Sequence, residues 1–521
     1  MCGIVGYVGE RDCTDVLLDS LSKLEYRGYD SAGIAVFENG EITVEKAKGE
    51  LKNLREKVAE HKPMGHCGIG HTRWATHGEP SDINSHPHGN KRVSIVHNGI
   101  IENYKDIKNF LIEKGYTFIS ETDTETVAKL LDYYYEGDPV DAIIKTLKDV
   151  RGAYALGIVF KDFPDRIFAV RKDSPLIIGA GDEENFIASD VPAILKYTRN
   201  YYLLEENEIA TIKSDRVEFC DMHKLPVKKE VQVSNLDMDA AEKGGYEHFM
   251  LKEIHEQPAA VRDTVSPRII NGMPDLSQDG VDMQKLKDYR QIFIVACGTA
   301  MHAGMVGKYV IEKLARKPVI VDIASEFRYR DPIITKDDLM IVISQSGETA
   351  DTMAVLRLAK EVGAATLAVV NVVGSSIARE ADMVIYTHAG PEISVASTKA
   401  YMVQISVMYL LAFELAYANG TIDKERCMEL TAQLGQMPDI IRETLELKDT
   451  CSFVASKLVN AESLLYIGRG LDYALSMEGS LKLKEISYIH SESYAAGELK
   501  HGTISLITEG MPVIAVATQK K

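Results

Sequence analysis

Apolar residues follow two different patterns along the chain. Up to about residue 220, short apolar runs end in tight turns and alternate with a few amphipathic segments. From about residue 285, runs that are apolar at every position lead into a loop and then a helical pattern, as at 292–298, 339–344 and 366–372. Continuously apolar strands are typical of a parallel sheet covered on both faces. We therefore expect a layered α+β region followed by an α/β region.

The first region contains two strong local signals. Residues 33–37 and 41–47 flank Asn39-Gly40, and this dipeptide favours the positive φ angles of a hairpin turn. Thr122 and Glu125 form a possible capping box for a following helix. A further strand at 93–97 is expected to end at Asn98-Gly99, before an amphipathic helix.

The second region contains an internal repeat. Gly298 and Glu326 are 28 positions apart, as are Gly470 and Glu498. Each glycine follows an apolar strand and precedes a helical pattern, so a duplicated unit is indicated. The predicted domains are 1–220, an interdomain connection at 221–284, a first α/β domain at 285–450, and a second at 451–521.

Composition excludes several classes of protein. The 521 residues are 45% hydrophobic and 26% charged, which is typical of globular proteins. The net charge of −18 argues against binding of nucleic acid or an anionic membrane, and an anionic substrate would need a local trap. Seven scattered cysteines without a CxxC pair, and no signal peptide, predict a cytoplasmic protein with reduced thiols. The apolar stretch 401–418 is interrupted by polar residues, so we expect a buried helix and no membrane span.

Cys2 is the first candidate for chemistry. Removal of the initiator Met1 would leave Cys2 at the N-terminus, where its own α-amine could accept the thiol proton. A cysteine at this position is usually without function, so the assignment depends on its surroundings. Asn98-Gly99 offers a side-chain amide beside a backbone N–H, as an oxyanion hole requires. Arg73 and Asp123 could bind the carboxylate and ammonium groups of an amino acid.

Histidines are concentrated in the same region. Seven of the fourteen lie between positions 61 and 97. A metal site is one interpretation, but no helical His-x-x-x-His pair or cysteine pair accompanies them. We favour loop packing and hydrogen bonding within a substrate-binding loop, and we predict no metal or other cofactor.

In the second region, Ser344-Gln345-Ser346-Gly347-Glu348-Thr349 lies between a predicted strand and a helix. Hydroxyl groups and helix N-terminal amides at this position could hold a phosphate. Serine or threonine at a helix start is more often a simple N-cap. The place of this segment at the carboxyl end of a parallel strand favours a ligand site.

Several ordered motifs together resemble a known family. They are CGIVGYVG at 2–9, LEYRGYDSAGIA at 24–35, GIGHTRWATHGEP at 68–80, VHNGIIENY at 96–104 and ETDTE at 121–125. These resemble the class II glutamine amidotransferase domain, an N-terminal nucleophile fold with αββα layers. The whole chain resembles the glutamine–fructose-6-phosphate aminotransferases, also called glucosamine-6-phosphate synthases, with sugar-isomerase (SIS) repeats in the second region.

The resemblance implies roles for residues of the first region. Cys2 would be the nucleophile, and Asn98 with Gly99 would form the oxyanion hole. Trp74 would gate the passage of ammonia to the second region. The residues implied to surround glutamine are Arg73, Thr76, His77 and Asp123.

The resemblance also implies roles in the second region. Glu485 would move a proton between sugar carbons 1 and 2, supported by Lys482. His501 would open the sugar ring, acting across a homodimer interface. The residues implied to hold the sugar phosphate are Thr299, Ser344, Gln345, Ser346, Thr349 and Ser397.

Two departures from the family pattern affect these expectations. Residue 300 is alanine where the family places a serine that binds phosphate. The sequence also ends at 513–521, just past the second repeat's counterpart of 339–344, so the second SIS domain is expected to be truncated. The family's Schiff-base lysine then has no counterpart.

The expected activity is glutamine-dependent conversion of fructose 6-phosphate to glucosamine 6-phosphate and glutamate. Because of the expected truncation, we expect glutaminase activity to survive and synthase activity to be strongly reduced. Two alternatives stay open: a glutaminase joined to a phosphosugar sensor, and a non-enzymatic phosphosugar-binding regulator. Separate measurements of glutamate and amino sugar would distinguish them.

Overall fold

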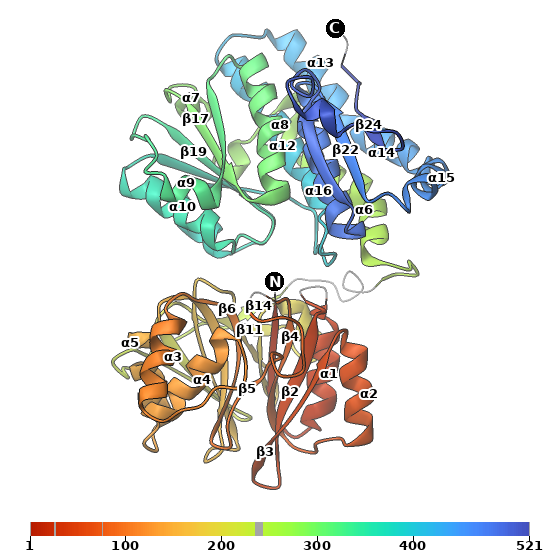
Figure 1. Cartoon of the computed structure of the whole chain (residues 1–521). Helices are drawn as coiled ribbons and strands as arrows, with labels where there is room; N and C mark the ends of the chain where they lie inside the picture. The colour runs from red at the N-terminus through yellow and green to blue at the C-terminus, as the bar shows by residue number, and fades with distance from the viewer. Residues whose placement is uncertain (1, 26–27, 76, 235–242, 520–521) are drawn as a thin grey trace. The chain divides into compact units, whose positions relative to one another are not determined.

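The computed structural model describes residues 2–25, 28–75, 77–234 and 243–519. The chain forms two compact units, residues 1–242 and 243–521 (Figure 1). Each unit has its own sheets and its own hydrophobic core, and each is described separately below.

Two antiparallel sheets form the centre of the first unit. One has the strand order β14-β11-β9-β10-β1-β4-β2-β3, and the other has the order β13-β12-β8-β7-β6-β5. The strands of the first sheet are β1 (Gly3–Val8), β2 (Ser31–Glu38), β3 (Glu41–Lys48), β4 (Cys67–Arg73), β9 (Ile177–Ala180), β10 (Asn185–Ala188), β11 (Asn200–Leu203) and β14 (Gln232–Val233). Those of the second are β5 (His88–Gly89), β6 (Val93–Ile101), β7 (Gly152–Phe160), β8 (Arg166–Lys172), β12 (Glu208–Lys213) and β13 (Val217–Asp221).

Helices cover the outer face of each sheet. The first sheet carries α1 (Cys13–Ser22) and α2 (Leu51–Glu60), and the second carries α3 (Tyr104–Glu113), α4 (Asp123–Tyr134) and α5 (Pro139–Asp149). Between the sheets, Ile4, Val96 and Ile167 belong to one buried apolar cluster. The expected αββα layering is therefore confirmed, because each amphipathic helix and each sheet has an apolar face to bury.

The local signals of the first unit are mostly confirmed. Asn39 and Gly40 have φ angles of 52° and 80° and join β2 to β3, as the hairpin signal predicts. Thr122 Oγ1 accepts a hydrogen bond of 3.3 Å from Glu125 N–H at the start of α4. The expected end of a strand at 97 is wrong. β6 continues to Ile101, because residues 98–101 pair with β7.

The second unit is built on a parallel sheet with the order β18-β17-β19-β20-β21. Its strands are β17 (Ile292–Ala296), β18 (Val319–Ile323), β19 (Leu339–Ser344), β20 (Ala365–Val370) and β21 (Met383–Tyr386). One face packs against α8 (Gly298–Leu314) and α12 (Lys399–Ala418), and the other packs against α9 (Ala324–Tyr329), α10 (Ala350–Glu361) and α11 (Ser376–Glu380). The continuously apolar strands thus have both faces covered, as predicted.

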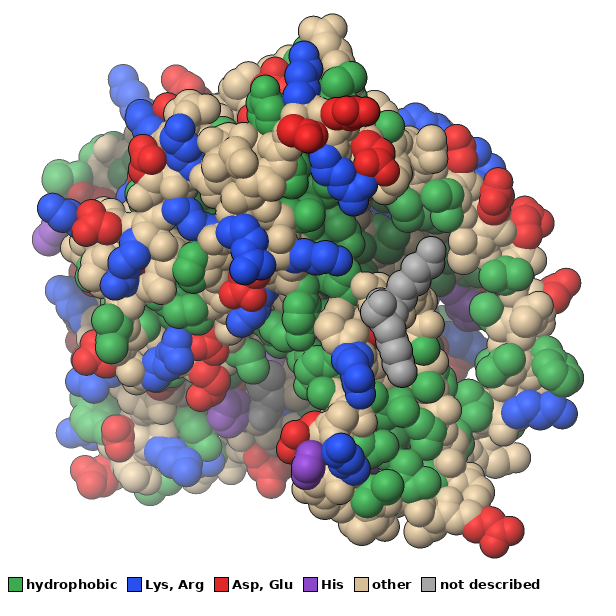
Figure 2. Space-filling view, turned by 90° about the horizontal axis from the view of Figure 1, so that it is seen from above, with side chains coloured by type: hydrophobic (Ala, Val, Ile, Leu, Met, Phe, Trp, Pro, Cys, Tyr) green, Lys and Arg blue, Asp and Glu red, His purple; other side chains and the backbone are tan. Residues whose placement is uncertain are grey.

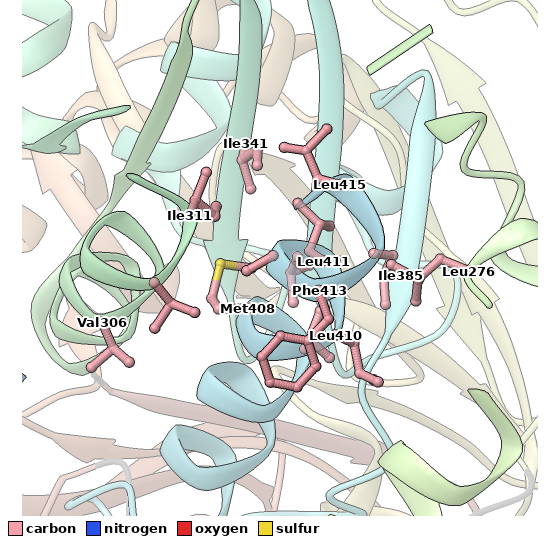
Figure 3. Close-up of a cluster of buried hydrophobic side chains, with 14 of the residues drawn as sticks. Leu276, Val306, Ile311, Ile341, Ile385, Met408, Leu410, Leu411, Phe413 and Leu415 are labelled. Carbon is pink, nitrogen blue, oxygen red and sulfur yellow. The ribbon is translucent and has the colours of Figure 1, made fainter. Parts of the chain in front are cut away.

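α12 is the central helix of this unit. It is the one helix among the described residues long and apolar enough to span a membrane, and 72% of its most apolar window is buried inside the protein. Met408, Leu411 and Leu415 pack in the same apolar cluster as Ile341 of the sheet (Figure 3). The expected buried helix is therefore confirmed.

The internal repeat appears in the topology. β22 (Ser463–Gly468) leads into α16 (Leu471–Ser487), and β22 lies between β23 (His490–Ala495) and β24 (Val513–Ala515) in a parallel sheet. β17 likewise leads into α8 and lies between β18 and β19. Gly298 and Gly470 have φ angles of 55° and 61° at the starts of the corresponding helices. α13 (Lys424–Gly435), α14 (Met437–Leu445) and α15 (Lys448–Leu458) separate the two repeats.

The segment 221–284 is not a single connection as expected. At its start, β14 pairs with β11 of the first unit. Beyond the division between the units, α6 (Phe249–Val265) packs against α12 and α14. Its apolar residues Val261 and Val265 belong to the core of the second unit. This amphipathic helix was not predicted, because the segment is rich in charged residues and was interpreted as a connection.

Charges of both signs are mixed on the surface. On the face shown in Figure 2, Lys and Arg side chains are interspersed with Asp and Glu. This distribution fits the net charge of −18 and offers no continuous basic area on that face.

Candidate active sites

Cys2 lies directly before β1, beside the end of β4. Its Sγ accepts a hydrogen bond of 3.2 Å from Trp74 N–H and lies 3.4 Å from Trp74 O. Asn98 Nδ2 donates to Cys2 O at 3.0 Å. The structure thus brings together the predicted nucleophile and the predicted oxyanion-hole amide, although 96 positions separate them in the sequence.

The thiol of Cys2 needs a base. Burial raises its pKa, and the hydrogen bond from Trp74 N–H partly opposes this effect. A thiol with a raised pKa is a weak nucleophile near neutral pH unless a neighbouring group accepts its proton.

Asn98 and Gly99 lie on β6 rather than in a loop. Gly99 has a φ of +125°, and a Cβ added there would lie 2.0 Å from Ala153 O. Only glycine meets both conditions without strain. Asn98 Oδ1 lies 3.0 Å from His71 Nε2, so both ends of the Asn98 amide have partners.

Arg73 is the last residue of β4 and interacts electrostatically with both Cys2 and Asp123. Arg73 Nη2 donates to Gly78 O at 3.0 Å and also to His77 O, whereas Arg73 Nη1 is buried with no hydrogen-bond partner among the described residues. Burial lowers the pKa of the Arg73 guanidinium, and its electrostatic interactions with Cys2, Asp30 and Asp123 oppose that effect. Asp123 begins α4, is 4% exposed and accepts Ile101 N–H through Oδ2 at 2.8 Å.

The remaining predicted residues of the first unit are His77, Trp74 and Thr76. His77 packs edge-on against Tyr104 with ring centroids 5.3 Å apart. Trp74 is 37% exposed and packs edge-on against Tyr29 at 5.4 Å. Thr76 lies outside the described residues.

Four histidines form a buried cluster behind Asn98, and we call His71, His86, His88 and His97 the histidine cluster. The His71 and His86 ring centroids are 4.2 Å apart, and those of His86 and His88 are 4.9 Å apart. His86 Nε2 and His97 Nδ1 lie 2.8 and 2.9 Å from Thr124 Oγ1. Sequence reasoning located these histidines but missed their hydrogen-bonding partners, which lie on β6 and α4.

Burial lowers the pKa of all four histidines in the histidine cluster, which favours their neutral forms. Burial lowers the pKa of His71 to about 3 and lowers those of His86 and His88 well below the ordinary value. Within the described part of the chain, no group of three or more His, Cys, Asp or Glu side chains could hold a metal ion. The expected packing in a loop is wrong for three of the four histidines, because His71, His88 and His97 lie on β4, β5 and β6.

The segment 344–349 joins β19 to α10 in the second unit. Ser344 Oγ accepts Gly347 N–H at 3.0 Å and lies 3.0 Å from Thr349 Oγ1. Ser346 Oγ accepts Glu348 N–H at 3.2 Å, and Gln345 Oε1 is buried without a partner among the described residues. The hydroxyl groups therefore gather at the carboxyl end of β19 and at the start of α10.

The neighbouring predicted residues have partners within the protein. Thr299, in the first turn of α8, donates to Glu478 Oε1 at 2.9 Å. His302 Nδ1 lies 2.7 Å from Glu478 Oε2, so Glu478 joins α16 to α8. Ser397 donates to Glu392 Oε2 at 2.8 Å. Sequence reasoning missed Glu478 and Glu392, because a lone glutamate gives no signal of a distant partner.

Lys482 and Glu485 are adjacent on α16. Lys482 Nζ lies 2.5 Å from Glu485 Oε2 and 3.5 Å from Glu478 Oε1. His501 is exposed in the turn after β23 and forms no hydrogen bond with either residue in the described part of the chain. The structure thus joins two of the three predicted isomerase residues.

The second repeat places a carboxylate where the first repeat has an alanine. Asp472 and Ala300 each lie two positions after the glycine that starts their helix. Asp472 accepts Thr518 N–H at 2.9 Å and Gln519 N–H at 3.3 Å, and Thr518 Oγ1 donates to it at 2.6 Å. Residues 518 and 519 follow β24, the counterpart of β19.

Models of two known families match the two regions of the chain. The model of the glutamine amidotransferase domain matches residues 71–196, and the model of the SIS domain matches 285–413 and 457–521. A solved structure, the C-terminal domain of glucosamine-fructose-6-phosphate aminotransferase from Francisella tularensis, is 40% identical with a TM-score of 0.52. That likeness covers 54% of this chain and 78% of the solved chain.

Whole-length relatives are more similar still. The glutamine–fructose-6-phosphate aminotransferase [isomerizing] of Caldanaerobacter subterraneus subsp. tengcongensis is 58% identical, and that of Clostridium tetani is 57% identical. Each match covers 100% of this chain and 86% of the relative. The chain thus spans 86% of the length of each relative, and the truncated second domain stays a prediction. The chain belongs to the glutamine–fructose-6-phosphate aminotransferase family.

Proposed function

We propose that the protein transfers the amide nitrogen of glutamine to fructose 6-phosphate and isomerises the product to glucosamine 6-phosphate, releasing glutamate. The observation that carries this proposal is the grouping in one site of Cys2, Asn98 and Arg73 Nη1, a buried nitrogen with no hydrogen-bond partner among the described residues. A buried N–H donor without a partner is costly, so this nitrogen is suited to the substrate carboxylate. Asp123 would bind the substrate ammonium group, with His77 and Thr76 completing the glutamine site.

The first half-reaction follows from the position of Cys2. Once Met1 is removed, the α-amine takes the thiol proton, and Sγ attacks the side-chain carbonyl carbon of glutamine. Asn98 Nδ2–H and Gly99 N–H stabilise the oxyanion of the tetrahedral intermediate. The α-ammonium then protonates the amide nitrogen of the intermediate, and the C–N bond breaks to release neutral ammonia and leave the glutamyl thioester. Water hydrolyses the glutamyl thioester to glutamate and restores the thiol.

The second half-reaction takes place at the sugar-phosphate site. Ser344, Gln345, Ser346 and Thr349 would hold the phosphate, with Thr299 and Ser397 nearby. Ammonia condenses with the C2 carbonyl group of the open sugar and releases water. Glu485 then removes a proton from C1 and returns one to C2, supported by Lys482. His501 would open the sugar ring across a homodimer interface, and Trp74 would gate ammonia.

The cellular setting is part of the proposal. All seven cysteines are free, which supports a reducing cytoplasmic location. The acidic net charge supports a protein that acts on small molecules, with no nucleic-acid or membrane partner.

Separate measurement of glutamate and glucosamine 6-phosphate tests the proposed function. Wild-type protein should form both products in the presence of both substrates, and Cys2→Ala should abolish both. Glutamate without amino sugar would favour the sensor alternative, and neither product would favour the binding regulator. Intact mass provides a check on the mechanism, because retained Met1 would leave the thiol without its α-amine.

A further inference from the structure

His71, one member of the histidine cluster, is the partner that determines which way the Asn98 amide faces. His71 is fully buried on β4, and its Nε2 lies 3.0 Å from both Asn98 Oδ1 and His97 O. A backbone carbonyl oxygen can only accept a hydrogen bond, so His71 Nε2 must carry the proton. The atom of Asn98 that faces this N–H must then be its oxygen, and its NH2 group faces Cys2.

The ring of His71 is itself held in place. His86 packs on it with ring centroids 4.2 Å apart, and His86 Nε2 contacts Thr124 Oγ1 at 2.8 Å. Thr124 lies in the first turn of α4, next to Asp123. Burial lowers the pKa of His71 to about 3, so the ring stays neutral and keeps a single proton.

An asparagine without such a partner could turn its oxygen toward the substrate. The oxyanion would then face a carbonyl oxygen rather than an N–H donor, which repels the developing negative charge. We propose that His71 is a positioning residue of the oxyanion hole, and that its Nε2–H holds the Asn98 amide with NH2 toward the scissile bond. This inference rests on the proposed glutaminase function of the first unit.

Two amide variants of His71 test this inference in the full chain. The side-chain nitrogen of glutamine reaches about as far as Nε2 of histidine, whereas that of asparagine reaches only as far as Nδ1. His71 Nδ1 has no partner in the described structure, so His71→Gln loses no bond there. We expect His71→Gln to keep kcat for glutamine hydrolysis within about fivefold of wild type, and His71→Asn to lose about tenfold or more with little change in KM.

His88→Asn is the matched control. His88 is equally buried, and its Nε2 contacts Thr122 Oγ1 at 3.1 Å rather than Asn98. We expect this variant to keep wild-type kcat. Alkylation of Cys2 by iodoacetamide needs no oxyanion hole, so its rate should be unchanged in every His71 variant.

A double-mutant cycle with Asn98→Ala distinguishes an effect of His71 through Asn98 from a general disturbance of the fold. If His71 acts through Asn98, His71→Asn should cost nothing further once Asn98 is replaced. An equal loss in both backgrounds, an equal loss in His88→Asn, or full activity of His71→Asn would each overturn the proposal. If His71→Asn fails to fold, loss of kcat in the folded His71→Gln would overturn it.

The Cys2→Ala variant keeps the two hypotheses apart. Glutamine hydrolysis by wild type that is unaffected by Cys2→Ala would refute the proposed function itself. Hydrolysis that depends on Cys2 but not on His71 would refute only the positioning role.

Discussion

At the residue scale, Gly99 is subject to two separate constraints. Its φ of +125° disfavours any side chain, and an added Cβ would lie 2.0 Å from Ala153 O. Gly115 has a φ of +89° but nothing within 4 Å of an added Cβ. Replacement of either glycine is therefore disfavoured by its positive φ, but only at Gly99 would the new Cβ also clash with a neighbouring atom.

We expect Gly115→Ala to lower the free energy of unfolding by about 1 kcal/mol, because only the positive φ is penalised. Gly99→Ala should cost more than this and should also reduce glutaminase kcat, because β6 must shift away from β7. Urea denaturation and glutamine hydrolysis check both effects. Equal destabilisation by the two substitutions would show that the contact with Ala153 is relieved without cost.

The neutral histidine cluster predicts acid sensitivity of the first unit. His71, His86 and His88 have pKa values below the ordinary value in the folded chain, so the unfolded chain binds more protons below about pH 6.5. The free energy of unfolding should therefore fall as the pH is lowered from about 7 to about 5. His88→Gln removes one of these groups and should weaken that dependence in urea titrations. An unchanged dependence would mean that His88 is not kept neutral by burial.

At the scale of the element, the chain's patterns predicted the interiors of strands and helices better than their ends. The hairpin of β2 and β3 was predictable because Asn39-Gly40 is a local signal. The length of β6 was not, because residues 98–101 are extended by pairing with β7. Cys2, Asn98 and Asp123 were recognisable as candidates, but His71 gained its role only through contact with Asn98. Contacts between residues far apart in the chain produce no periodic pattern in a single sequence, so they could not be predicted from it.

α6 holds a loop that carries a predicted phosphate residue. Glu253 Oε1 accepts Ile393 N–H at 2.5 Å and Ser394 N–H at 3.0 Å, just before Ser397. Burial raises the pKa of Glu253 to about 7, although these two hydrogen bonds oppose the effect. Deprotonation of Glu253 as the pH rises through about 7 therefore places a negative charge in a buried position, which is energetically unfavourable.

Because the folded-state pKa is raised, the folded chain binds more protons than the unfolded chain between about pH 4.5 and 7. The stabilisation associated with Glu253 is therefore lost as the pH rises through that window. Glu253→Gln should make the unfolding of the second unit less dependent on pH, as followed by urea titration. Glu446→Gln is a suitable control, because Glu446 is exposed. A Glu253→Gln profile parallel to wild type would contradict the raised pKa.

At the scale of the whole molecule, the two units have separate cores, and the proposed function gives them different ligands. A phosphosugar that binds only the second unit should stabilise that unit by mass action, by about 2.7 kcal/mol at 100 times its Kd. In calorimetry of the full chain, fructose 6-phosphate should raise the melting temperature of one transition and leave the other unchanged. Ser346→Ala should reduce that increase. An equal shift of both transitions would contradict separate ligand sites.

The duplicated architecture raises the question of how many phosphosugars one chain binds. In the second repeat, Asp472 already receives the two backbone N–H groups and the hydroxyl that follow β24. Because Asp472 is part of the chain, its carboxylate is present at a fixed effective concentration beside these donors. An external anion would have to compete with it for the same N–H and hydroxyl groups. Titration calorimetry should therefore give one fructose 6-phosphate per chain rather than two. On the proposed function, segment 344–349 of the first repeat binds the sugar phosphate, whereas its counterpart after β24 is already bonded to the carboxylate of Asp472.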